Sequence, residues 1–121
     1  MHNNQNQNTL KKMNFLNRIE IRGIVGHTST NNHGGKKILN LSVVTEHASK
    51  TADGTPVVDM QWFTVTAWEG SCPALPDTIE KGDWVHLTGR LRTRRYVNAQ
   101  GEDAVAVDIV ASRIDKLQKD A

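Results

Sequence analysis

Apolar and polar residues alternate along most of this sequence. The alternation is clearest in five segments: IEIRGIV (19–25), ILNLSVV (38–44), MQWFTVTAW (60–68), WVHLTGRLRTRRYV (84–97) and DAVAVDIV (103–110). A period of two is typical of β-strands that bury one face and expose the other. We therefore expect five strands around one core, with the last strand directing Val105, Val107 and Ile109 inward.

Turn-forming residues separate the strands, and one segment departs from the period of two. HTSTNNHGG (27–35), ASKTADGTP (48–56) and NAQG (98–101) contain the Gly, Asn, Asp and Pro residues typical of turns, so we expect loops there, the first two of them long. PALPDTIEKG (73–82) instead predicts a short helix capped by Gly82. Five strands with a helix between the third and fourth indicate an all-β fold, the five-stranded Greek-key OB-fold barrel.

The chain length and composition favour one domain with polar ends. A chain of 121 residues is large enough to bury its own core. Residues 1–13, rich in Asn and Gln, are expected to be a disordered extension, followed by the barrel over 14–117 and by a C-terminal end, 118–121, without an acidic tail. Cys72 is the only cysteine and no apolar N-terminal run resembles a signal, so we expect a cytoplasmic protein without a membrane segment.

Large aromatic residues occupy positions that the alternation assigns to the outside of the barrel. Trp62 and Trp68 share the outward side of the third strand, and Trp84 lies with His86 on the outward side of the fourth. A Trp that faces water leaves much of its contact area unused, so an outward pair indicates a partner that covers the rings. The alternative is that these rings pack under loops or at a subunit interface.

Three arginines and a tyrosine alternate along GRLRTRRY (89–96). Arg90, Arg92 and Arg94 share a face with Tyr96, with neighbouring arginines roughly 7 Å apart. No acidic residue interrupts this row along the strand, and like charges at that spacing repel, so the row costs stability unless a polyanion neutralises it. The net charge of +2 is too small to identify a polyanion partner by itself.

Rings and arginines together match the needs of single-stranded nucleic acid. Bases stack on aromatic rings with little dependence on sequence, while guanidiniums contact the backbone, and a duplex hides the base faces that rings would bind. This interpretation requires Trp62 and Trp68 to face outward and the arginines to be free of carboxylates from their own chain. The alternative for the arginines is a solvated edge strand whose charge blocks unwanted pairing.

Five stretches follow one another in the order found in a known family: NRIEIRGIVG (17–26), GGKKILNLSVVTE (34–46), QWFTVTAWE (61–69), IEKGDWVHLTGRLRTRRY (79–96) and NAQGEDAVAVDIVA (98–111). Over about residues 14–117 the sequence resembles the bacterial single-stranded DNA-binding proteins. This resemblance implies an OB-fold, sequence-tolerant binding of single-stranded DNA in replication, recombination and repair, and assembly as a homotetramer or a dimer.

The resemblance also suggests site residues. Trp62 and Trp68 fall where the family stacks bases, Tyr96 falls where it often has Trp, and Trp84 is added on expected exposure alone. The candidate phosphate contacts are the basic residues of the fourth strand and of the neighbouring loops: Arg90, Arg92, Arg94, Arg95, Lys36, Lys37 and Lys50. A family ring near Ser49 is missing, and the chain stops at KLQKDA without the acidic tip that recruits repair proteins, as an accessory copy or a truncated chain would.

Two other classes of function compete with strand binding. An enzyme would need converging catalytic or metal-binding groups, and the histidines, Cys72 and the scattered carboxylates show no such spacing, so we expect no cofactor and no metal. A protein-interaction module is the stronger rival: primosomal replication protein N is a relative without the tail that acts as a replication-restart adaptor. Retention of Trp62, Trp68 and the arginine row favours strand binding.

Overall fold

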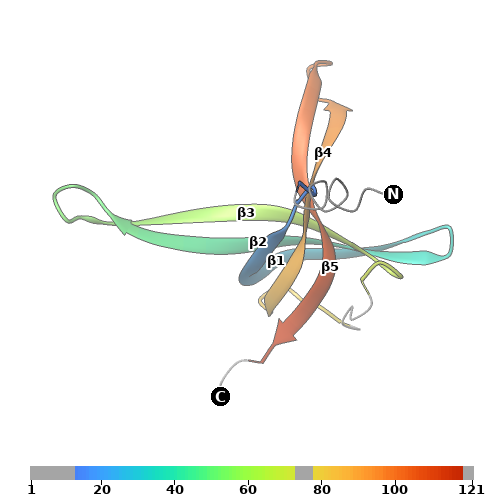
Figure 1. The fold of residues 1–121 in the computed structure, drawn as a ribbon, viewed down its shortest axis with the longest axis horizontal. Coiled ribbons are helices and arrows are strands. Elements are labelled where there is room, and N and C mark those ends of the chain that lie inside the picture. Colours follow the sequence, from blue (N-terminus) through green and yellow to red (C-terminus); the bar gives the residue numbers. More distant parts are fainter. Residues whose placement is uncertain (1–12, 73–77, 119–121) are drawn as a thin grey trace, which may run out of the picture.

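A closed barrel of five strands forms the centre of the molecule. The computed structural model describes residues 13–72 and 78–118. The strands are β1 (Ile19–His33), β2 (Lys36–Lys50), β3 (Pro56–Trp68), β4 (Trp84–Val97) and β5 (Asp103–Leu117). They follow the order β1-β2-β3-β5-β4 around the barrel, with β1 pairing β4 to close it and β3–β5 as the parallel pair (Figure 1). The predicted all-β, five-stranded barrel is confirmed.

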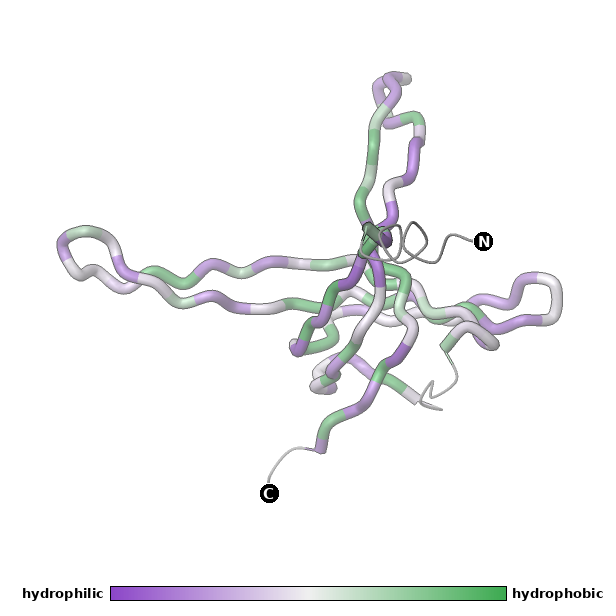
Figure 2. Tube along the Cα trace, in the orientation of Figure 1, coloured by the Kyte–Doolittle hydropathy of each residue, from purple (hydrophilic) through white to green (hydrophobic). Residues whose placement is uncertain are grey.

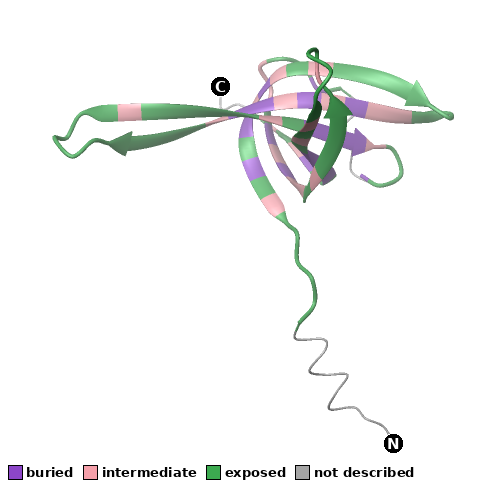
Figure 3. Ribbon diagram, turned by 90° about the horizontal axis from the view of Figure 1, so that it is seen from above, coloured by how far each residue is buried: buried purple, intermediate pink, exposed green. Residues whose placement is uncertain are grey.

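The core consists of the residues that the alternation directs inward. Each strand contributes side chains that are almost completely buried: Val25, Val43, Val65, Val85, Leu87, Ile109 and Ile114. Figure 3 shows these buried segments gathered in the barrel, with exposed segments extending away from it. Burial of these aliphatic groups, at about 25 cal/mol per Å² of apolar surface, is the main stabilisation of the barrel.

Three hairpins continue beyond the barrel as long arms. We call them the β1–β2 arm (residues 31–38), the β2–β3 arm (46–60) and the β4–β5 arm (92–108). The first two extend in opposite directions and the third to another side (Figure 1), and hydrophilic residues occur along all of them (Figure 2).

The prediction of long loops at 27–35 and 48–56 is therefore wrong, because both loops are much shorter. β1 runs to His33 and β2 to Lys50, because polar residues on an arm exposed on both faces can still pair in the backbone ladder. Only the hairpin tips are turns, and at the first tip Gly34 and Gly35 have φ of 60° and 81°.

The predicted inward position of Val105 and Val107 is also wrong. The two residues are 61% and 58% exposed, whereas Ile109 is buried as expected. The alternation is regular, but the barrel ends near Ile109, so the same strand face continues into solvent on the β4–β5 arm. Leu91 and Val97 lie on that face as well, because they alternate with the arginine row along β4.

The predicted helix is wrong for the part that the structure describes. Residues 78–82 form no helix, and residues 73–77 lie outside the described ranges. The Asp83 carboxylate accepts a hydrogen bond from the Glu80 N–H at 2.8 Å, and the Asp83 N–H donates to the Glu80 carbonyl at 3.0 Å. The Gly82 N–H donates to the Val25 carbonyl at 2.8 Å. These bonds hold the backbone in a turn against β1 and leave no helical ladder.

Most of the predicted N-terminal extension (1–13) and C-terminal end (118–121) lies outside the described residues. β1 begins at Ile19 and β5 ends at Leu117, while residues 1–12 and 119–121 are not described. In the ranges 13–72 and 78–118, no helix has the length and apolar character needed to cross a membrane.

Candidate nucleic-acid interface

The arginine row lies on one face of β4, as its alternation predicts. Directly opposite on β5 are Val110, Asp108, Ala106 and Ala104, which pair with Arg90, Arg92, Arg94 and Tyr96 in that order. Opposed residues of an antiparallel pair share a face. Tyr96 is 44% exposed near the end of the arm. Arg95 points to the other face, so only part of the predicted basic set forms one surface.

Asp108 contradicts the expectation that the arginines are free of carboxylates from their own chain. It accepts two hydrogen bonds from Arg92, from Nε at 3.0 Å and from Nη2 at 3.1 Å, and one from Arg94 Nε at 3.2 Å. These bonds, chiefly the one from Arg92, lower the pKa of Asp108, so the carboxyl is charged at neutral pH. Sequence reasoning missed this contact because it considered only β4, whereas the pairing register places Asp108 opposite Arg92.

One carboxylate neutralises only part of the row. Three guanidiniums with one carboxylate carry a net charge of about +2. Among the described residues Arg90 makes no ion pair. The surface therefore remains basic, although it is less self-repulsive than the sequence alone suggests.

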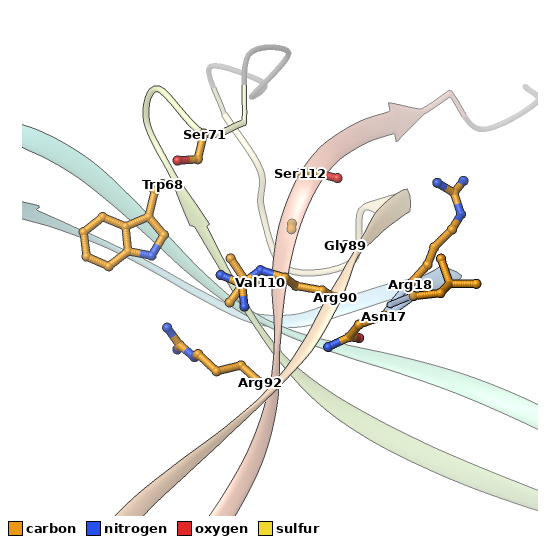
Figure 4. A pocket seen from close by; sticks show the side chains of 11 residues that line it. Asn17, Arg18, Trp68, Ser71, Gly89, Arg90, Arg92, Val110 and Ser112 are labelled. Carbon is orange, nitrogen blue, oxygen red and sulfur yellow. The ribbon is translucent and has the colours of Figure 1, made fainter. Parts of the chain in front are cut away.

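A groove beside the row brings Trp68 together with two of the arginines. Its volume is ≈ 750 Å³, and its lining includes Trp68, Arg90, Arg92 and Val110. The parallel pairing of Thr66 with Val110 places the end of β3 next to β5 and β4. Figure 4 shows the guanidiniums of Arg90 and Arg92 reaching towards the side where Trp68 lies. An indole and two cations therefore face one open space.

Two residues that sequence reasoning did not select complete the rim of this groove. The Asn17 side chain donates to the Leu91 carbonyl at 2.8 Å and accepts from the Leu91 N–H at 2.9 Å. This pair of bonds continues the β1–β4 ladder by one step and fixes the segment before β1. Asn17 and Arg18 consequently line the groove. Both lie inside the predicted barrel range, at the start of the stretch 17–26, but no local pattern indicated that they would line a groove.

Trp62 is a second ring on this side of β3 and is exposed, whereas Trp68 is half-buried and contacts the His33 ring edge-on, with the ring centroids 6.5 Å apart. Trp62 is 58% exposed as a residue, and its ring lies over Gly26 of β1, where a Cβ atom would come within 2.7 Å of Trp62 Cη2. Trp62 is six residues from Trp68 on the same side of the strand, roughly 20 Å away. The predicted outward direction of both rings is confirmed, and Val58 and Met60 continue the exposed row from Trp62 along the β2–β3 arm.

The structure does not bring the remaining candidates to this surface. Trp84 starts β4, next to Leu117, about 40 Å along the strand from Tyr96. Lys36 and Lys37 lie at the tip of the β1–β2 arm, and Lys50 lies at the tip of the β2–β3 arm. These residues are dispersed over the molecule, so a chain in contact with all of them would have to follow several arms.

His86 is part of a hydrogen-bonded cluster between β1 and β4. Arg22 Nε donates to His86 Nδ1 at 3.3 Å, which leaves Nε2 to donate to Glu20 at 2.8 Å. These contacts lower the pKa of Glu20, chiefly through the hydrogen bond from His86. Within residues 13–72 and 78–118, no three His, Cys, Asp or Glu side chains lie close enough to hold a metal ion.

Comparison with known proteins gives a consistent family. The model of the Single-strand binding protein family matches residues 16–117. A single-stranded DNA-binding protein of Neisseria meningitidis serogroup B is 27% identical over 104 residues, which are 84% of this chain and 60% of the relative. Single-stranded DNA-binding protein 2 of Tropheryma whipplei strain Twist is 35% identical over 73 residues, 60% of this chain and 47% of the relative. The chain thus spans about 60% of the length of the Neisseria relative.

Solved structures share the fold. A Plasmodium falciparum SSB in complex with ssDNA aligns with a TM-score of 0.76 at 19% identity, covering 87% of this chain and 97% of that one. The wild-type single-stranded DNA binding protein of Thermus aquaticus aligns with a TM-score of 0.68 at 22% identity, covering 85% and 50%. These similarities confirm the predicted OB-fold.

Proposed function

Because this chain belongs to the single-strand binding protein family, we propose that it binds single-stranded DNA with little dependence on base sequence. Bases stack on exposed rings while guanidiniums contact the phosphates between them. The proposed stacking residues are Trp62, Trp68 and Tyr96, and the proposed phosphate contacts are Arg90, Arg92 and Arg94.

One observation carries this proposal: Trp68, Arg90 and Arg92 line one open groove. A base on the indole would leave its flanking phosphates within reach of the guanidiniums. Base–aromatic stacking contributes about 1–3 kcal/mol per base and tolerates any base, because every base has a π-face. A duplex offers stacked, covered bases, so the groove favours unpaired strands.

The related proteins support a role in DNA metabolism rather than in catalysis. Their names describe single-stranded DNA-binding proteins of bacteria. We propose that this chain protects unwound strands during replication, recombination and repair, in the cytoplasm and as a homo-oligomer, with a tetramer as first choice. Trp84 and the lysines of the hairpin tips are outer contacts, used only when a longer strand wraps around the arms.

Tryptophan fluorescence tests the proposal directly. Titrating the protein with oligothymidine should quench a large part of the emission, because stacked bases quench indoles, with a binding site of many nucleotides. A duplex of equal length at the same salt should quench much less. Equal affinity for both forms, or no quenching by either, would contradict stacking on exposed rings.

A second candidate function, an adaptor that contacts other proteins, is favoured by one surface. Leu91, Val97, Val105 and Val107 are exposed on the face of the β4–β5 hairpin away from the arginine row, where Thr93 and Arg95 lie among them. Exposed apolar side chains mark contacts with protein partners, whereas a nucleic-acid backbone is contacted by polar and charged groups. Little fluorescence change with oligothymidine would favour an adaptor function of the kind that primosomal replication protein N has.

A further inference from the structure

Asp108 is the buried charge at the centre of the arginine row. Its side chain is 4% exposed and lies on the same face of the hairpin as Arg92 and Arg94. Three N–H groups converge on its two oxygens, two from Arg92 and one from Arg94. A carboxylate removed from water in this way is stable because its acceptors are occupied by charge-assisted hydrogen bonds.

The guanidiniums keep donors for a ligand while they are held by Asp108. Arg94 uses only Nε, and Arg92 uses Nε and one Nη2 hydrogen, so each retains further N–H groups. The Arg94 side chain is 51% exposed and that of Arg92 is 33% exposed. Solvent therefore reaches both guanidiniums but hardly reaches the carboxylate, and an incoming phosphate would meet the arginines first.

Long side chains lose conformational freedom when they bind a ligand, and this loss weakens binding. Arg92 and Arg94 have already lost part of that freedom in the free protein, because their Nε atoms are anchored to one buried group. A phosphate that binds them meets donors already in place.

We propose that Asp108 is a positioning residue for single-stranded DNA: it fixes the guanidiniums of Arg92 and Arg94 in the orientation that contacts phosphates. This inference rests on the proposed function. It differs from the simple electrostatic expectation, in which a carboxylate among phosphate-binding arginines only weakens binding.

The two views predict opposite signs for Asp108→Asn. The substitution raises the net charge by one unit, so electrostatics alone predicts tighter binding. Loss of positioning predicts weaker binding. Asp115→Asn is the matched control: Asp115 lies on the same strand, pairs with Arg113 Nε at 2.9 Å, and is away from the groove lining, so its substitution adds the same charge without releasing Arg92 or Arg94.

The experiment measures oligothymidine affinity by fluorescence anisotropy at fixed salt for wild type, D108N and D115N. We expect D115N to bind as tightly as wild type or slightly more tightly, and D108N to bind about fivefold or more weakly, the lower end of the ordering cost for two long side chains. Asp108→Glu, which restores the charge, should recover part of the loss. D108N binding equal to or tighter than D115N overturns the positioning role.

A measurement on the wild-type protein keeps the inference testable if D108N fails to fold. NMR should show Nε–H signals of Arg92 and Arg94 protected from solvent exchange in the free protein, and still protected after oligothymidine binds. Unprotected signals in the free protein would overturn the inference. Wild type that does not bind oligothymidine at all would instead overturn the proposed function.

Discussion

Gly26 has no side chain that could contact a base, but the absence of a side chain leaves room for the Trp62 indole. A methyl group at this position would come within 2.7 Å of Trp62 Cη2 and closer still to Cζ3, so Gly26→Ala must displace the indole. Gly26 does not use the left-handed backbone region, so alanine fits the backbone itself. The substitution therefore moves the ring while leaving it in the protein.

The loss of affinity in Gly26→Ala should not exceed the loss caused by removing the Trp62 ring. Trp62→Ala should weaken oligothymidine binding by about 1–3 kcal/mol if a base stacks there. Gly26→Ala should cost part of this, about 1 kcal/mol or roughly fivefold in Kd. Stability should change little, because the displaced ring is exposed and Gly→Ala restricts the unfolded chain by about 0.4–1 kcal/mol.

A double-mutant cycle tests the physical cause. Fluorescence anisotropy with labelled oligothymidine gives Kd for wild type, the two single variants and the double variant, and urea unfolding checks stability. In the Trp62→Ala background, Gly26→Ala should have no further effect on binding, because the ring it displaces is absent. An equal loss in both backgrounds would refute the claim that Gly26 acts through Trp62.

Three further predictions follow from single contacts. Trp68→Ala should weaken oligothymidine binding by about 1–3 kcal/mol, whereas Trp84→Ala should leave the affinity for a short oligonucleotide unchanged; the reverse order would place the main site at the start of β4. Asn17→Ala should lower the free energy of unfolding in urea by about 1–2 kcal/mol, because it removes both hydrogen bonds to Leu91, and an unchanged midpoint would show that water replaces them. Hydrogen bonds from Thr51 and Thr55 to the Asp53 carboxylate lower the pKa of Asp53 to about 2 from 3.8. Asp53 therefore stabilises the fold above about pH 4, and this contribution is lost as the pH falls towards 2. The difference in Tm between wild type and Asp53→Asn should shrink over that range, and a constant difference would contradict the assignment.

The alternation of residues predicted most of the fold because each barrel strand buries one face. Ile21, Leu41 and Val65 lie in the core as their period requires. The limits of the barrel could not be predicted in this way. Val107 and Ile109 have the same chemistry and the same direction along the strand, and only the three-dimensional closure of the barrel decides that one is exposed and the other buried.

The candidate site was predictable on each strand but not across strands. The outward direction of Trp62 and Trp68 follows from spacing within β3. The pairing of Asp108 with Arg92 depends on the register between β4 and β5, and the groove depends on the parallel contact between β3 and β5. Such contacts join residues that are distant in the sequence, and local patterns contain no information about them.

The salt dependence of oligothymidine binding tests most directly whether rings and arginines contact the same strand. If the arginine row and the lysines of the hairpin tips together meet about four to six phosphates, log K should fall against log salt with a slope of about −3 to −4. The Trp62→Ala/Trp68→Ala double variant should give a parallel line at least about tenfold weaker, because stacking is lost while phosphate contacts remain. A flat line for wild type, or a double variant that coincides with wild type, would contradict contact of the rings and the arginines with one strand.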